Sequence, residues 1–152
     1  MSERRFTLVP ITPENTDALL ADLTDEARKR DPMTGRIPDD AVIAEWDRFY
    51  QVNGGWSGMF LDEGGQVLIF LGAVRLDSGM GFSAGLLTRR LANDRKLLAQ
   101  SLREWRKRLG PGHWMTVAFK GSPEAEKLLR HAGFSRMDFQ PDARYIMLET
   151  EV

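Results

Sequence analysis

The chain has 152 residues, of which 42% are hydrophobic, and its formal net charge at pH 7 is −1. We expect one globular domain spanning residues 1–152, and the balanced charge gives no general reason to expect binding to nucleic acid or to a membrane. The absence of cysteine excludes disulfides, thiolate catalysis and cysteine metal sites. The sequence shows neither a secretory signal nor an apolar run of roughly 20 residues. We therefore expect a soluble, cytoplasmic protein without a membrane span.

The first third of the chain predicts a strand followed by two helices. Arg5–Ile11 alternates loosely between polar and apolar residues, as a strand does. Thr12 is a suitable cap for a helix that begins with proline and presents an apolar face as far as Ala27. After a loop with two prolines, Asp39 or Asp40 begins the second helix.

Three strands are predicted next, in direct succession. Trp56–Leu61 and Gln66–Leu76 are separated by Asp62–Gly65, whose sequence Asp-Glu-Gly-Gly favours a hairpin turn. A second turn leads into Phe82–Thr88, which has the short, apolar composition of a buried strand. Strands that follow one another without helices favour antiparallel pairing.

The segment after this third strand predicts a polar turn and a long amphipathic helix. Arg89–Asn93 is the turn, and Asn93 is a suitable N-cap for a helix that begins at Asp94. A strand that leads into a helix N-terminus is a common anion site, because free N–H groups and the positive end of the helix dipole face the loop. The helix presents apolar residues at helical spacing, at Leu97, Leu98, Leu102, Trp105 and Leu109.

The rest of the chain predicts a strand, a short helix and a closing hairpin. Trp114–Phe119 is the strand, Ser122 caps the helix, and Gly133 ends it in a left-handed conformation. Phe134–Phe139 and Arg144–Glu149 form the hairpin. The order β-α-α-β-β-β-α-β-α-β-β predicts an α/β fold with a mixed, twisted sheet and helices on both faces.

This order resembles the GNAT superfamily of acyl-CoA-dependent N-acyltransferases over nearly the whole chain. The best local match is SPEAEKLLRHAGF, residues 122–134, which is similar to the family segment Asn-x-x-Ala-x-x-Leu-Tyr-x-x-x-Gly-Phe. The resemblance implies a GNAT-like fold and a site for acetyl-CoA, with an unknown small molecule or protein as acceptor. No metal is implied, and the distant His113 and His131 lack the spacing of metal ligands.

The cofactor loop of the family has the form Arg/Gln-x-x-Gly-x-Gly/Ala, and here the equivalent run is Arg89–Asp94. Arg89 matches, whereas Ala92 and Asp94 stand at the two small positions. Asp94 places a negative charge where the pyrophosphate would lie, which neighbouring basic residues would have to offset. The cofactor contacts implied by the resemblance come from Leu87, Thr88, Arg89, Ala92, Asn93, Asp94, Arg95, Lys96 and Ser122.

The catalytic groups of the family are also replaced. Leu129 stands where a tyrosine often protonates the leaving thiolate, and Gly81–Leu87 lacks the acid that often serves as general base. No catalytic residue is assigned, and a non-catalytic role is favoured, although some family members work by proximity alone.

A narrower resemblance is to small GNAT-like internal virion proteins of short-tailed bacteriophages. It rests on the chain length, the basic amphipathic helix, the aromatic strand around Trp114 and the ending GFSRMDFQPDARYIMLE. The favoured hypothesis is therefore a GNAT-fold phage or prophage component with a degraded cofactor loop, located in the virion and binding other virion proteins. The alternatives are an active acetyl-CoA-dependent N-acetyltransferase, and a nucleic-acid or phosphate binder that uses the basic helix. The nucleic-acid alternative is disfavoured because few aromatics interleave with the basic residues.

Overall fold

The structure is a computed structural model that describes residues 6–30, 34–119, 123–138, 140 and 145–152. The predictions made for Arg5, for Ser122 and for parts of the closing hairpin lie outside these residues. The strands are β1 (Thr7–Val9), β2 (Trp56–Leu61), β3 (Val67–Arg75), β4 (Gly81–Leu87), β5 (His113–Phe119), β6 (Ser135–Arg136) and β7 (Tyr145–Glu151). The helices are α1 (Pro13–Ala21), α2 (Asp25–Lys29), α3 (Asp40–Val52), α4 (Arg89–Ala92), α5 (Arg95–Leu109) and α6 (Pro123–His131).

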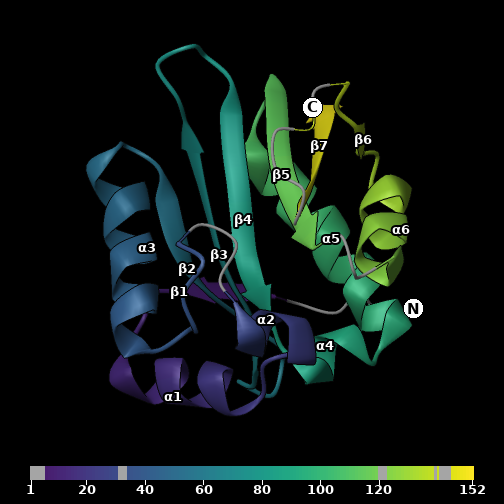
Figure 1. The fold of residues 1–152 in the computed structure, drawn as a ribbon. Helices are drawn as coiled ribbons and strands as arrows, with labels where there is room; N and C mark the ends of the chain where they lie inside the picture. The colour runs from purple at the N-terminus through teal and green to yellow at the C-terminus, as the bar shows by residue number, and fades with distance from the viewer. Residues whose placement is uncertain (1–5, 31–33, 120–122, 139, 141–144) are drawn as a thin grey trace.

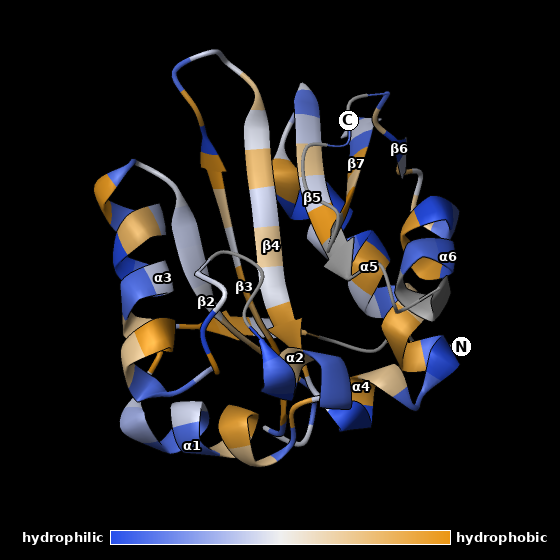
Figure 2. Cartoon of the chain, viewed as in Figure 1, coloured by the Kyte–Doolittle hydropathy of each residue, from blue (hydrophilic) through white to orange (hydrophobic). Residues whose placement is uncertain are grey.

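The strands form one mixed sheet in the order β1-β2-β3-β4-β5-β7-β6. All neighbours are antiparallel except β4 and β5, which are parallel. The predicted α/β class and the antiparallel run of three strands are therefore confirmed. Helices cover both faces, and Figure 2 shows their apolar residues turned towards the sheet.

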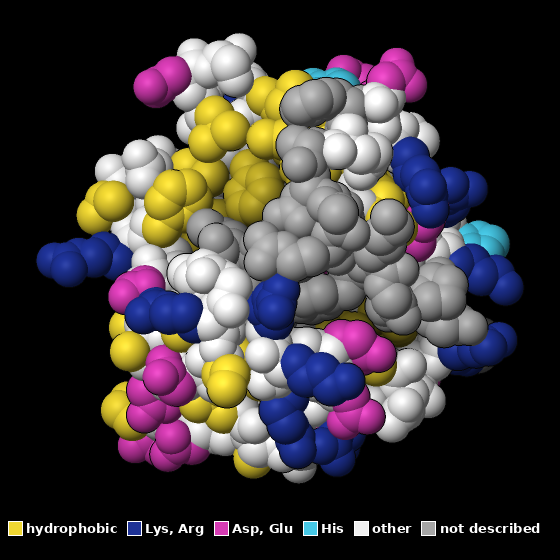
Figure 3. All heavy atoms as spheres, in the orientation of Figure 1, with side chains coloured by type: hydrophobic (Ala, Val, Ile, Leu, Met, Phe, Trp, Pro, Cys, Tyr) yellow, Lys and Arg dark blue, Asp and Glu magenta, His cyan; other side chains and the backbone are white. Residues whose placement is uncertain are grey.

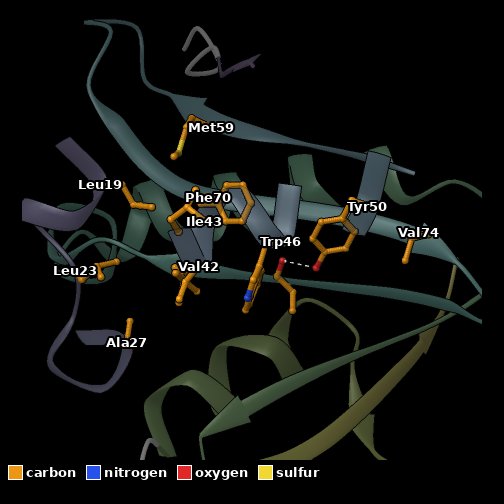
Figure 4. Close-up of a cluster of buried hydrophobic side chains, with 12 residues drawn as sticks. Leu19, Leu23, Ala27, Val42, Ile43, Trp46, Tyr50, Met59, Phe70 and Val74 are labelled. Carbon is orange, nitrogen blue, oxygen red and sulfur yellow. Dashed lines mark hydrogen bonds between the residues drawn. The ribbon is translucent and has the colours of Figure 1, made fainter. Parts of the chain in front are cut away.

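A separate core lies on each face of the sheet. On one face, α1, α2 and α3 pack on the sheet through a cluster that includes Leu19, Trp46, Tyr50 and Phe70 (Figure 4). On the other face, α5 and α6 pack through residues such as Trp105. Alternate residues of each strand point to opposite faces, so a single strand supplies both cores.

The first predicted helix is interrupted, which corrects the expectation of one helix as far as Ala27. α1 ends at Ala21, and Thr24 caps the separate α2 by accepting a hydrogen bond from the N–H of Ala27. Between the two helices the main chain bonds to the end of β4, where the N–H of Thr24 donates to the carbonyl of Leu87 at 3.1 Å. Tertiary pairing with the strand therefore overrides the local helical pattern.

The predicted polar turn at Arg89–Asn93 is also corrected. Its first four residues form the short helix α4, which Thr88 caps. The cap of α5 is Asp94 and not Asn93, because the Asp94 carboxylate accepts the Leu97 N–H at 3.0 Å. Because the cap lies one residue later than predicted, a charged side chain stands at the N-terminus of α5.

The parallel strands β4 and β5 pair over only two residues. The register joins Gly81 with Trp114 and Phe82 with Met115, after which the strands separate. A side chain at Gly81 would collide with the Trp114 ring, because a Cβ would lie 2.2 Å from its Cε3. Figure 1 shows β4 and β5 side by side at their beginnings and apart at their carboxyl ends.

Trp105 of α5 connects the two parts of the divided sheet. Its Nε1 donates to the Ser83 hydroxyl at 2.8 Å, and that hydroxyl donates to the Gly72 carbonyl at 2.6 Å. On its other side the indole stacks on Phe134, with ring centroids 5.0 Å apart. α5 is thus bonded to β4 and packed against the residues that precede β6.

The Trp105→Phe substitution tests this connection. We expect it to lower the free energy of unfolding by about 1–3 kcal/mol, because it removes a buried hydrogen bond and leaves a small void. Urea unfolding of the variant measures the loss. The control is Trp56→Phe at a half-buried position of β2, where we expect a smaller effect. Equal midpoints for Trp105→Phe and the wild type would contradict the assignment.

His113 lies between two carboxylates of β7. Its Nδ1 is 2.6 Å from Glu151 Oε1, and its Nε2 is 3.0 Å from Glu149 Oε2. The hydrogen bond to Glu151, supported by Glu149, raises the pKa of His113 above its ordinary value of 6.5 against a smaller opposing effect of burial. Folding therefore favours the protonated imidazole.

Because the pKa is higher in the folded state, the stabilisation by His113 is complete below about pH 6.5 and is lost as pH rises through the folded-state value. We expect the difference in Tm between the wild type and His113→Gln to shrink from about pH 6 to about pH 9. Thermal unfolding across this range measures it, with His131→Gln as the comparison. A difference that is constant with pH would refute the pairing.

Candidate functional site

The separation of β4 and β5 opens a cavity of about 400 Å³ in the sheet. Ala84 and Leu86 of β4 and Val117 of β5 line it on the side of α2 and α3, because they belong to or pack on the core of that face. Leu102 and Trp105 of α5 line it on the opposite side. The cavity therefore lies between the two faces of the sheet.

The lining of this cavity is apolar with few exceptions. Its polar side chains are Thr24, Glu26, Ser101 and Thr116, and Glu26 is the ionisable residue among them. Glu26 is an exposed residue of α2, and it makes no hydrogen bond or ion pair with the described part of the chain. The cavity thus has one carboxylate, on the α2 side. Figure 3 views this face of the molecule and shows apolar side chains gathered between α3 and β4.

A second hollow of about 720 Å³ lies between α5 and α6, and we call it the basic groove. Its basic side chains are Arg95 and Arg103 of α5 with Lys127 and His131 of α6, and no acidic side chain lines it. The groove and the cavity have Ala92, Leu98, Leu102 and Leu128 in common, so they adjoin. A ligand with an anionic part and an apolar part fits the pair.

The loop that would bind an anion has its own N–H groups occupied. The N–H groups of Arg89 and Arg90 donate to the backbone carbonyl and the carboxylate of Asp22. The N–H of Leu91 bonds to the hydroxyl of Thr88, and those of residues 92–94 bond back to carbonyls of α4 and its cap. Residues 88–94 therefore offer no free N–H to a phosphate.

Asp94 lies at the N-terminus of α5, where the sequence predicted an anion site. Its carboxylate accepts the N–H of Leu97, and its carbonyl accepts the N–H of Leu98. Of the first turn of α5, the N–H groups of Arg95 and Lys96 have no hydrogen bond within the described residues. Two N–H donors remain where the family motif implies a whole loop of them.

The structure distributes the predicted cofactor residues over several places. Ala92, Asn93 and Arg95 line the basic groove, and Leu87 and Ala92 line the cavity. Four others do not line either hollow: Thr88 is buried as a cap, Arg89 donates to the Leu23 carbonyl, Asp94 caps α5 and Lys96 is exposed. Ser122 lies outside the described residues.

Several residues of the site are missing from the sequence-based set. Arg103, Lys127 and His131 line the groove, and Glu26 and Thr116 line the cavity. A helical stripe could have indicated Arg103, because Arg95, Ala99 and Arg103 are spaced by four residues and present a small residue between two cations. Glu26 and Thr116 carry no such signal, since their roles depend on where β4 and β5 separate.

The basic residues of α4 and α5 do not form one surface. Arg90 pairs with Asp62 at 2.9 Å, and Arg106 donates to the Glu151 carbonyl at 2.9 Å. Arg108 pairs with Glu104 at 3.4 Å and lies over the Phe60 ring. Only Arg95 and Arg103 of this basic set face the groove.

This sheet, open between its parallel strands and flanked by helices on both faces, is the fold of the GNAT superfamily acetyltransferases. A GNAT phosphinothricin acetyltransferase from Sinorhizobium meliloti, in complex with AcCoA, superposes with a TM-score of 0.71 at 15% identity over 99% of this chain and 89% of that one. AAC(6')-Ib in complex with ribostamycin and coenzyme A superposes with a TM-score of 0.71 at 14% identity, over 96% of this chain and 93% of that one. A spermidine N-acetyltransferase chimera from Vibrio cholerae and hSSAT superposes with a TM-score of 0.61 at 11% identity, over 99% of this chain and 96% of that one.

These likenesses confirm the predicted GNAT fold. No protein-family model matches the sequence, and no curated protein matches it closely. Within the described ranges, no helix is long and apolar enough to cross a membrane, and no group of three His, Asp or Glu side chains is placed to hold a metal ion. The phage resemblance stays a prediction.

Asp94 offers a test of the capped loop. Asp94→Ala removes the side-chain acceptor of the Leu97 N–H, and we expect it to lower the free energy of unfolding by about 1 kcal/mol. Asp94→Ser keeps a side-chain acceptor, and we expect it to lower the free energy of unfolding by only a few tenths of a kcal/mol. Urea unfolding of both variants measures the effect, and equal losses would show that the cap is not what Asp94 contributes.

Proposed function

We propose that this protein binds an acyl-coenzyme A and transfers the acyl group to an amine. The observation that carries the proposal is the separation of β4 and β5 around an apolar cavity that adjoins the basic groove. The neighbours in complex with AcCoA or coenzyme A have the same fold, which supports this choice of cofactor.

The groove supplies the charge that the cofactor loop lacks. Arg95, Arg103 and Lys127 are exposed, flexible cations that can face phosphate groups, and Arg95 and Lys96 add free N–H groups at the N-terminus of α5. Contacts made by exposed side chains are screened by salt more than contacts made by buried amides. The proposal therefore implies a cofactor affinity that falls with ionic strength.

The cavity supplies an apolar passage for the thioester arm. A coenzyme A thioester brings an activated acyl group, and the apolar side chains of Leu86, Leu102 and Leu128 exclude water from it. Beyond Phe82, alternate main-chain groups of β4 face the opening without a partner in β5. The Leu87 carbonyl is bonded to the Thr24 N–H, and the N–H groups on this side are available to a ligand.

Glu26 makes the α2 side of the cavity acidic. An amine that enters from α2 meets this carboxylate, which can hold the protonated form and accept its proton. The acceptor side is thus acidic and the cofactor side is basic. Catalysis then depends on holding amine and thioester together, since Leu129 lines the cavity where the family places a tyrosine.

A second candidate is a GNAT-fold component that binds a ligand or a protein without catalysis. The occupied N–H groups of residues 88–94, the cap at Asp94 and the leucine at position 129 favour it. The phage or prophage assignment, with virion proteins as partners, belongs to this candidate. It rests on the sequence resemblance alone.

Titration calorimetry with acetyl-CoA tests the first candidate. We expect micromolar binding by the wild type, and a loss of about two- to fivefold in affinity for Arg103→Gln, because one exposed phosphate contact is removed. The control is Arg48→Gln, an exposed arginine on α3 outside the groove, which should bind as the wild type does. Absence of binding at millimolar acetyl-CoA would refute the first candidate and leave the second.

A further inference from the structure

Thr116 is a buried residue whose hydroxyl makes no hydrogen bond with the part of the chain that the structure describes. Its side chain is 3% exposed, and none of the described hydrogen bonds includes it. Most other buried hydroxyls are satisfied: that of Ser83 donates to the Gly72 carbonyl, and that of Thr150 donates to the Gly133 carbonyl at 2.8 Å. The hydroxyl oxygen is not one of the fully enclosed side-chain atoms that lack a partner, so it is open to the cavity that Thr116 lines, where a ligand can be its partner.

The position of Thr116 indicates what that partner is. It follows Met115, the last residue of β5 that pairs with β4, so it stands at the point where the strands separate. It lines the cavity, whereas the other unbonded buried hydroxyl, that of Thr16 on α1, does not. Among the cavity's other hydroxyls, Thr24 caps α2 and Ser101 donates to the Leu98 carbonyl at 2.8 Å.

We propose that the Thr116 hydroxyl donates a hydrogen bond to the sulfur of the acyl thioester and stabilises the thiolate as it leaves. The inference rests on the proposed acyl transfer. The unpaired N–H groups of β4 serve the thioester carbonyl oxygen, so the sulfur faces β5. A thiolate that forms among Leu102, Trp105 and Leu129 is poorly solvated, and Thr116 is the free donor beside it.

The neutral amine nitrogen attacks the thioester carbonyl carbon, and the new C–N bond replaces the C–S bond, whose electron pair stays on sulfur. Thr116 keeps its proton and only donates a hydrogen bond to that sulfur. The proton lost by the amine passes to Glu26 or to water, and the thiolate later takes up a proton from solvent. The products are an amide and a free thiol.

The ionisation of bound coenzyme A measures this contact without an acceptor. The ultraviolet absorbance of the thiolate, followed against pH with coenzyme A bound, gives the pKa of its thiol. The variants are Thr116→Val, which has the same shape without the hydroxyl, Thr116→Ser, which keeps it, and Thr16→Val as the matched control. We expect the acid dissociation constant of the bound thiol to fall about two- to tenfold in Thr116→Val.

Thr116→Ser should restore the wild-type value, and Thr16→Val should leave it unchanged. Thr116→Val should also unfold at the same or a higher urea concentration than the wild type, because it removes a hydroxyl that has no partner. If coenzyme A binds to all variants and its thiol ionises equally in the wild type and in Thr116→Val, the inference is wrong while the proposed function stands. If coenzyme A binds to none, both are refuted.

Discussion

The hydrogen bond from Trp105 to Ser83 is the contact on which the geometry of the cavity depends. The sheet consists of an antiparallel part that ends in β4 and another that begins with β5, and only two residue pairs join them. β3 and β4 pair over seven residues, as do β5 and β7, so each part is rigid by itself. Trp105 bonds to the first part and stacks on Phe134 of the second. α5 therefore holds the two parts at a fixed separation, and the cavity is a consequence of that separation.

A second constraint fixes the other end of β4 and has a functional consequence. Asp22 accepts the N–H groups of Arg89 and Arg90, the Leu23 carbonyl accepts Arg89, and Asp62 pairs with Arg90. Burial raises the pKa of the Asp62 carboxyl, but the hydrogen bonds from the Gln66 and Gly64 N–H groups and the pairing with Arg90 together outweigh it and hold the pKa below its usual value. This network ties α4 to the segment after α1 and to the turn after β2. The same bonds use the donors that would otherwise face a phosphate, so the proposed binding of an anion depends on side chains of the groove.

Much of the fold could be predicted from the sequence because its signals are local. Thr12 and Asp39 cap the helices that they were expected to begin, and Trp56–Leu61 is a strand with the predicted bounds. Gly133 has the predicted positive φ, at 99°. The errors occur where a tertiary contact decides. Leu23 and Thr24 leave the helix to bond with the end of β4, and the cap of α5 moves from Asn93 to Asp94.

The candidate site was harder to predict, because its residues come together only through the topology. Arg95 and Ala92, which line the groove, also belong to the loop that the family motif indicates, but Lys127 lies in α6 and Glu26 in α2, about 30 and 70 residues away. Thr116 could not be distinguished by sequence from any strand threonine. Its significance depends on a neighbour that is missing: the strand that would have covered it diverges.

The role of Asp94 as a helix cap reduces the repulsion that its carboxylate would exert on a phosphate in this site. As an unpaired carboxylate it would repel a phosphate by roughly 1 kcal/mol in water at about 4 Å, and by more in a partly buried site. As the cap of α5 it lies against the Leu97 N–H and the positive end of the helix dipole, which offset part of its charge. Arg95 and Arg103 project from the same helix into the groove. The balance of charges beyond the first turn of α5 is therefore positive, which is compatible with an anion bound by side chains beside the loop.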